Sequence, residues 1–182
     1  IYAIAGDSIE SLKKSPHLEA FLEKDYEVLY LIDPYDEILF SQVTEFQDKK
    51  IQFIGRGEVA LGTDEEKEQK RQEQESQQKD FAKLIENLEK LLKNEVASVR
   101  ISSRLTSSPA CLVGLEGDVS PHLQRILSKM GSAELPATKR ILEINPKHSL
   151  LLKMREKFDN DPENAILAKY ASLLFGQSLL AE

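Results

Sequence analysis

A stretch without any apolar side chain, from Thr63 to Asp80, divides this sequence into two parts. Its Glu, Gln and Lys residues favour helix, but such a segment cannot bury a core. Apolar residues then recur with the spacing of one helix face, at Phe81, Leu84, Ile85, Leu88, Leu91 and Leu92. We predict one long helix that is solvated at its start and docked at its end, with a domain boundary along it.

The part before the polar stretch predicts a small α/β/α layer. Ser15-Pro16 and Asp33-Pro34 mark helix starts, because a capping residue precedes Pro at the first helical position. Strands that alternate with helices pair in parallel through right-handed crossovers. The expected strands are Tyr2–Gly6, Glu27–Ile32 and Ile51–Ile54, and the expected helices are Ser8–Lys14, Pro16–Lys24 and Pro34–Val43.

The part after the polar stretch mixes strands and helices without a strict rhythm, which is typical of an α+β fold. The expected strands are Ser98–Ser102, Ala110–Val113 and Arg140–Ile144, and the expected helices are Pro121–Met130, Ser149–Phe158 and Pro162–Glu182. We therefore predict an α/β domain at residues 1–80, with a polar helical junction at 63–80, and an α+β domain at 81–182.

Composition narrows the class of protein. The 182 residues carry a net charge of −7, which argues against nucleic-acid or membrane-surface binding by bulk electrostatics. The single cysteine excludes an intrachain disulfide and suits a reducing compartment. No apolar run is long enough to span a membrane.

The sequence shows no pattern typical of a catalytic, cofactor or metal site. Its glycines form no phosphate-binding loop, and one cysteine cannot build a sulfur site. The candidate residues have ordinary structural interpretations: His17, His122 and His148 as surface or cap-adjacent residues, Cys111 as a buried inert thiol, and Asp33, Asp36 and Glu37 as acids of a helix cap and first turn.

Two amphipathic segments suggest binding surfaces. The segment 119–130 has an apolar stripe, which either packs on its own domain or faces a partner. The final segment, 165–182, is apolar on more than one face, so a helix there needs cover from further residues or another subunit. Because the sequence starts inside a strand and ends inside a helix without a stop signal, we expect a piece of a longer protein.

Six motifs, in order, resemble the ninety-kilodalton heat-shock chaperones, most closely the bacterial type called HtpG. They are IYAIAGDS at 1–8, SPHLE at 15–19, EVLYLIDPYDE at 27–37, SSRLTSSPACLV at 102–113, ILEINPKH at 141–148 and LLFGQSLLAE at 173–182. The resemblance covers nearly the whole chain, and the polar stretch matches only in character. It implies the end of the middle domain followed by a C-terminal dimerisation domain that lacks its final helix.

The resemblance also implies a function. The chain would be a part of an ATP-dependent chaperone that assists protein folding in the bacterial cytoplasm. The expected partners are partially folded client proteins and a second copy of the chain, with no nucleic acid or membrane. ATP and Mg²⁺ would bind upstream in the full-length protein, so we expect no catalytic residue, cofactor or metal here, and no ATP hydrolysis.

Site residues follow from the family's motifs. The client-binding positions implied are Val119, Leu123, Ile126, Leu127 and Met130 on the amphipathic helix, with Glu37, Ile38 and Ser41 after the DPYDE motif. Many members have an aromatic residue where this chain has Ile38. The dimerisation positions implied are Ile166, Tyr170, Leu173, Leu174, Leu179 and Leu180. We expect a weak or altered dimer, or another association through an exposed Leu174/Phe175 side.

Two alternatives stay open from the residues alone. Residues 1–62 would suit a small ligand-binding or enzyme domain with its site at strand ends near Gly6-Asp7 or Asp33, although the Gly-rich turn is missing. The chain would also suit a purely structural dimerisation scaffold, which only a client-binding test separates from the first hypothesis.

Overall fold

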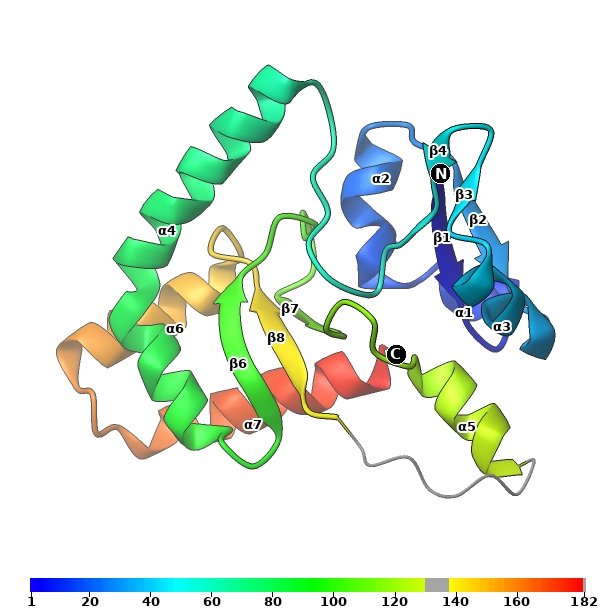
Figure 1. Ribbon diagram of the computed structural model, residues 1–182. Coiled ribbons are helices and arrows are strands. Elements are labelled where there is room, and N and C mark those ends of the chain that lie inside the picture. Colours follow the sequence, from blue (N-terminus) through cyan, green and yellow to red (C-terminus); the bar gives the residue numbers. More distant parts are fainter. Residues whose placement is uncertain (130–137, 182) are drawn as a thin grey trace.

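The computed structural model describes residues 1–129 and 138–181, without the side chains of Pro34, Ser41, Pro121, Ile126 and Lys129. Figure 1 shows a sheet from residues 1–62, hereafter the N-terminal part, beside a second sheet from residues 93–181, the C-terminal part. The long helix α4 (Asp64–Leu91) connects the two parts and runs along the outer side of the second sheet.

The N-terminal sheet has three parallel strands in the order β2-β1-β5, which confirms the predicted α/β arrangement. Its small core surrounds Phe21 and Ile54, both wholly buried. The strands are β1 (Tyr2–Ala5), β2 (Val28–Leu31) and β5 (Gln52–Phe53), and the helices are α1 (Ile9–Leu12), η1 (Pro16–Leu18), α2 (Glu19–Glu23) and α3 (Pro34–Gln42).

A short antiparallel hairpin, β3 (Glu45–Phe46) and β4 (Lys49–Lys50), was not predicted. Its two-residue turn places Gln47 at φ 49° and Asp48 at φ 60°, in the left-handed region that a primed hairpin turn requires. The turn lacks the Gly that usually marks this geometry, and each strand has two residues, so periodicity gave no signal.

Helix α4 begins with a capping box, in which Thr63 accepts from the Glu66 N–H and the Glu66 carboxylate accepts from the Thr63 N–H. Its predicted apolar face is buried at Phe81, Leu84, Ile85, Leu88 and Leu92, but the prediction was wrong for Leu91, which is exposed. The polar half is less free than predicted, because Gln74 and Gln78 hydrogen-bond the backbone of Ile101 at the outer edge of the second sheet. These amides satisfy strand groups that would otherwise lack a protein partner.

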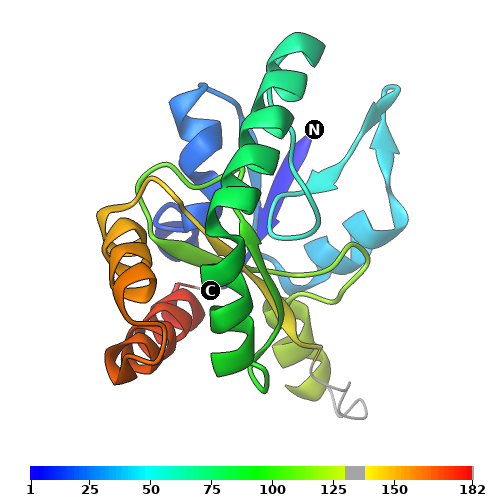
Figure 2. The ribbon, with the colours of Figure 1, turned by 90° about the vertical axis from the view of Figure 1, so that its left-hand side faces the viewer.

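The C-terminal sheet is mixed, with β6 parallel and β7 antiparallel to the central strand β8. Helices α4, α6 and α7 pack with it around the larger core (Figure 2). The strands are β6 (Val96–Ile101), β7 (Ala110–Val113) and β8 (Arg140–Ile144), and the helices are α5 (Pro121–Lys129), α6 (Ser149–Asn160) and α7 (Ala165–Leu180). The prediction that the last helix starts at Pro162 was wrong, because Asn164 provides the cap.

Helix α7 buries one face in this chain and exposes another. Leu167, Ala171 and Leu174 follow helical spacing and are buried, and Ala171 and Leu174 belong to the larger core. The prediction of an exposed Leu174 side was therefore wrong. The apolar side chains that remain exposed, Leu173, Leu179 and Leu180, lie on the rest of the helix surface.

A buried ion pair joins the two parts. Arg104 and Glu143 are 1% and 2% exposed, and Arg104 Nε lies 2.9 Å from Glu143 Oε2. Ser102 Oγ and Arg100 donate to the same carboxylate at 2.7 and 2.8 Å. Burial raises the pKa of Glu143, but the charges of Arg104 and then Arg100 outweigh it and hold the pKa below its ordinary value of 4.5.

The outer N–H groups of the Arg104 guanidinium reach the N-terminal part, where they donate to the carbonyls of Ile54 and Gly57. These carbonyls follow β5 directly. The Arg104 guanidinium therefore forms hydrogen bonds both with a carboxylate of the second sheet and with backbone carbonyls of the chain that leaves the first sheet. The main chains also meet, because Gly114 N donates to Gly55 O at 3.0 Å and Gly57 N donates to Gly114 O at 2.9 Å.

Glu19, at the start of α2, makes a further link. Its carboxylate accepts from the backbone N–H groups of Thr106, Ser107 and Ser108 at 2.7 to 3.0 Å. Burial raises the pKa of Glu19, but these hydrogen bonds together lower it below its ordinary value. Charge-assisted bonds to successive N–H groups hold the loop of the C-terminal part against α2.

Replacing Arg104 by Met should reduce the free energy of unfolding by about 3–5 kcal/mol, because Glu143 would be left buried with a weaker partner set. Chemical denaturation followed by circular dichroism measures this loss. Arg71→Met is the matched control, since Arg71 is exposed and pairs with the exposed acids Glu68 and Glu75 on α4, and its transition should stay close to the parent's. A loss below about 1 kcal/mol for Arg104→Met would contradict the importance of the pair.

Candidate functional site: the α3–α5 surface

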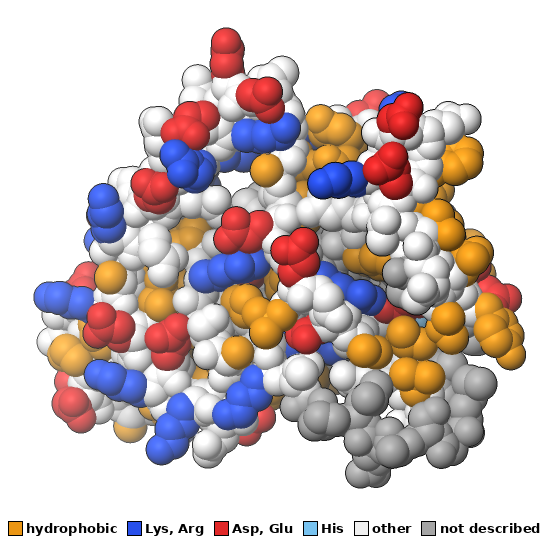
Figure 3. Space-filling view, viewed as in Figure 1, with side chains coloured by type: hydrophobic (Ala, Val, Ile, Leu, Met, Phe, Trp, Pro, Cys, Tyr) orange, Lys and Arg blue, Asp and Glu red, His pale blue; other side chains and the backbone are white. Residues whose placement is uncertain are grey.

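Helices α3 and α5 come from opposite parts of the chain and lie side by side. Figure 3 shows hydrophobic side chains gathered over this region, on the right-hand side of the view. On α3 the exposed members are Tyr35, Ile38 and Leu39; on and just before α5 the half-buried members are Val119, Leu123 and Leu127. We call these six side chains the α3–α5 surface.

Polar contacts fix the start of α5. Ser120 caps the helix, since its Oγ accepts from the Leu123 N–H at 3.0 Å and its carbonyl accepts from the Gln124 N–H. The same hydroxyl donates to Glu37 of α3. A carboxylate thus lies near the N-terminus of α5, where the helix dipole favours negative charge.

The Glu37 side chain is only 1% exposed, so it lies beneath the surface of α3. It also pairs with Arg56, whose guanidinium carbon stacks 4.6 Å above the Phe53 ring centroid. Burial lowers the pKa of Arg56, and the Glu37 charge opposes this effect. Glu37 therefore joins α3, the chain after β5 and the start of α5 through one carboxylate.

A second carboxylate, Asp7, reaches α5 from the loop after β1. Its carboxylate oxygens lie 2.9 Å from His122 Nδ1 and 3.0 Å from Arg125 Nη2, and both residues are on the first two turns of α5. The hydrogen bond from His122 lowers the pKa of Asp7 most, burial raises it somewhat, and the Arg125 charge lowers it further. The pair with Arg125 is solvent-exposed, whereas His122 is buried.

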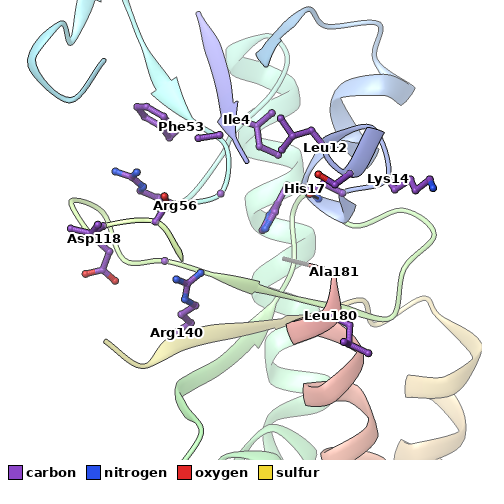
Figure 4. Close-up of a pocket in the computed structure, with 17 residues that line it drawn as sticks. Ile4, Leu12, Lys14, His17, Phe53, Arg56, Asp118, Arg140, Leu180 and Ala181 are labelled. Atoms are coloured by element: carbon purple, nitrogen blue, oxygen red, sulfur yellow. Dashed lines mark hydrogen bonds between the residues drawn. The ribbon is translucent and has the colours of Figure 1, made fainter. Parts of the chain in front are cut away.

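A cavity of about 250 Å³ adjoins the segment just before α5, and Figure 4 shows residues that line it. Val119 and Ser120 line it together with β1 and the end of α7. His17 and Arg140 point into it from opposite sides, whereas Lys14 points away. The base of α5 thus borders open space on this side, and polar contacts from Glu37 and Asp7 reach it from the N-terminal part.

His17 is next to the Ser15 cap of η1, which agrees with the cap-adjacent alternative that we predicted, but its side chain is buried rather than on the surface. Burial, and then the positive charge of Arg104, lower its pKa from 6.5 to about 3. The imidazole is therefore neutral at physiological pH. The other histidines differ, since His148 caps α6 by accepting from the Leu150 N–H and His122 is buried beside Asp7.

The structure brings together predicted client-binding residues from both parts of the chain. Ile38 of α3 is partly exposed near α5, whereas Glu37 has buried partners instead of a place on the surface. The side chains of Ser41 and Ile126, and the whole of Met130, lie outside the described residues. Of the predicted dimerisation residues, Leu173, Leu179 and Leu180 are exposed, Ile166 and Tyr170 are half-buried, and Leu174 is buried.

The other predictions about chemistry concern single residues. Cys111 is 1% exposed and burial raises its pKa well above the ordinary value, which confirms the buried thiol. Asp33 caps α3 and Asp36 lies in its first turn, as predicted, and the two also form a capping box. Within residues 1–129 and 138–181, we find no cluster of His, Cys, Asp and Glu that could hold a metal, and no helix with the length and apolarity to cross a membrane.

Sequence reasoning missed the partners that hold α5. Glu37 and Ser120 are 83 residues apart, and Asp7 and Arg125 are 118 apart, so no local spacing reports these pairs. The one available signal was Ser120 before Pro121, which matches the cap-and-Pro pattern that we applied to other helices. Nothing in the sequence indicated that the cap would have a buried carboxylate partner.

Comparison with known proteins agrees with this architecture. The family described as Hsp90 protein matches residues 1–182. The chain belongs to the Hsp90 family. Curated relatives named chaperone protein HtpG are 47% identical in Frankia casuarinae, 45% in Rhodococcus jostii and 42% in Geobacter metallireducens, each over 182 residues. These alignments cover 100% of this chain and 28% of each relative.

The family match bears out the resemblance seen in the six motifs. The chain spans 28% of the length of these Hsp90 relatives, so it corresponds to a part of each of them. Exposed apolar side chains gather on α3 and on one side of α7 in this Hsp90 chain.

The low pKa of His17 gives a pH prediction. The unfolded chain binds a proton at His17 below about pH 6.5, whereas the folded chain does so only near pH 3, so stability should fall as pH drops through this window. The free energy of unfolding of the parent should therefore fall by roughly 2 kcal/mol between pH 7 and 5 because of His17, and His17→Leu should remove this part of the fall. Denaturation of both proteins at several pH values measures the difference, and parallel pH profiles would contradict a neutral buried His17.

Proposed function

We propose that this chain is the client-binding and dimerisation part of an Hsp90-type chaperone. The observation that carries the proposal is the α3–α5 surface, in which apolar side chains from both parts of the chain lie together in a member of this family. Contiguous exposed apolar side chains commonly mark a binding site. The proposed partners are partially folded proteins in the bacterial cytoplasm.

The chemistry of this surface suits many different clients. Apolar burial is non-directional, so aliphatic side chains accept varied sequences without a fixed hydrogen-bond pattern. Each side chain contributes roughly 1.5–3 kcal/mol when fully buried, before entropy is lost on binding. The half-buried state of Leu123 and Leu127 reduces that gain further. The expected result is weak, broad binding, which two copies in a dimer would strengthen.

We propose that the second role, self-association, uses the exposed side of α7. Leu173, Leu179 and Leu180 present aliphatic surface there, and Ile166 and Tyr170 are half-buried nearby on the same helix. The buried side, which includes Leu174, already packs in the core of this chain. Association would therefore add a covering helix without disturbing that core.

We further propose that ATP and Mg²⁺ act in the full-length protein but not in this chain, which by itself does not hydrolyse ATP. The sequence has no Gly-rich phosphate loop to cradle a nucleotide. The two α5-holding carboxylates, Asp7 and Glu37, already have protein partners, so they are poor candidates for a base or metal ligand.

Replacing Leu123 and Leu127 together by Asp should weaken binding of an unfolded polypeptide about ten-fold or more, because charge would replace aliphatic surface. Fluorescence anisotropy with labelled, reduced and carboxymethylated lactalbumin measures this binding. Leu152→Asp is the matched control, since Leu152 is an exposed leucine on α6. If both proteins bind like the parent, the purely structural scaffold becomes the better hypothesis.

Self-association should depend on the exposed leucines of α7. Sedimentation velocity should show the apparent mass rising with concentration for the parent, and Leu173→Asp should lower it toward a monomer of 20.6 kDa. Leu152→Asp again serves as the control and should associate like the parent. A parent that stays monomeric at all concentrations, or a Leu173→Asp variant that associates normally, would contradict this role for α7.

A further inference from the structure

We propose that Asp7 and Glu37 are positioning residues that dock α5 against the N-terminal part and so hold the α3–α5 surface together. Glu37 contributes through the Ser120 cap, and Asp7 through His122 and Arg125. The two carboxylates form what we call the α5 latch. The inference deepens the proposed function and rests on it only where client binding is concerned.

The latch acts where packing is weak. The side of α5 near Val119 and Ser120 borders the cavity, so no close-packed core fixes the helix base there. Helix α5 has nine residues, which is too short for a helix to be stable by itself in water. Its order therefore depends on tertiary contacts, and the three polar contacts of the latch lie at its cap and within its first two turns.

Burial strengthens the Glu37 contact in particular. The carboxylate is 1% exposed, so its bond to Ser120 faces little competition from water. Arg56 balances its charge, and Arg56 is itself held by Phe53 and by the main-chain contact between Gly57 and Gly114. The position of Glu37 is thus determined by the junction of the two parts, and the start of α5 follows it.

Glu37 consequently affects clients without contacting them. Its buried position contrasts with the client-facing role that the family resemblance implied for it. A chain without the latch keeps the same apolar side chains, but α5 no longer has one fixed position beside α3. Binding a client would then carry the additional entropy cost of ordering α5.

Two substitutions test the latch without leaving Glu37 unpaired. Asp7→Ala removes the exposed contact. Ser120→Asp keeps an oxygen acceptor for the Leu123 N–H but places a negative charge against Glu37, so it opposes the latch while preserving the cap. Glu10→Gln, at an exposed acid three residues after Asp7, is the control.

Hydrogen exchange followed by mass spectrometry should show amides of α5 exchanging about ten-fold faster in both variants, with α7 and β8 unchanged. The control should exchange like the parent. Parent-like exchange of α5 in both Asp7→Ala and Ser120→Asp would overturn the latch, because other contacts would then hold the helix. This readout is independent of client binding.

Binding of labelled, carboxymethylated lactalbumin separates the latch from the proposed function. We expect the two variants to bind about three- to ten-fold more weakly than the parent, as α5 loses its preorganised position. Faster α5 exchange with unchanged binding would overturn the role of the latch in client binding but not the client surface itself, which the Leu123 and Leu127 substitutions test.

Discussion

The buried pair of Arg104 and Glu143 is the contact on which the arrangement of the two parts depends. Arg104 donates to Glu143 on the second sheet and to carbonyls of Ile54 and Gly57 next to the first sheet. A buried charge pair of this kind is expensive to break, because either partner alone would remain desolvated. The geometry of the carbonyls and the carboxylate around one planar guanidinium fixes orientation as well as distance.

The α3–α5 surface follows from that orientation. Helix α3 belongs to the N-terminal part and α5 to the C-terminal part, so their apolar side chains meet only when both parts are held in place. Glu37 and Asp7 then fix α5 locally through polar contacts. A short helix held in this way can present aliphatic side chains at the surface without requiring a large core beneath it.

Regular elements with strong local signals were predictable from the sequence. Strands β7 and β8 match their predicted bounds, and α4 follows from the polar stretch and the apolar spacing after Phe81. The hairpin at β3 and β4 was missed because its strands are too short to show a period. The start of α7 was misplaced because Asp161-Pro162 resembles a cap as closely as Asn164 does.

The contacts that build the site were not predictable, because they join residues far apart in sequence and use common side chains. The exposure of Leu174 was also not predictable, because α7 is apolar on more than one side and the pattern does not show which side packs in the core of this chain. The family resemblance supplied candidate positions, and the structure gave a burial to those whose side chains it describes. Glu37 shows what that second step adds, because its carboxylate is buried and bonded to Ser120 and Arg56 rather than exposed.

The distance between α3 and α5 tests most directly the claim that the two helices form one fixed surface. Spin labels can be placed on Leu39→Cys and Ser128→Cys, since the only native thiol, Cys111, is buried. Pulsed electron paramagnetic resonance should give a single narrow distance distribution. A broad distribution, or two separated populations in the absence of a client, would contradict the claim.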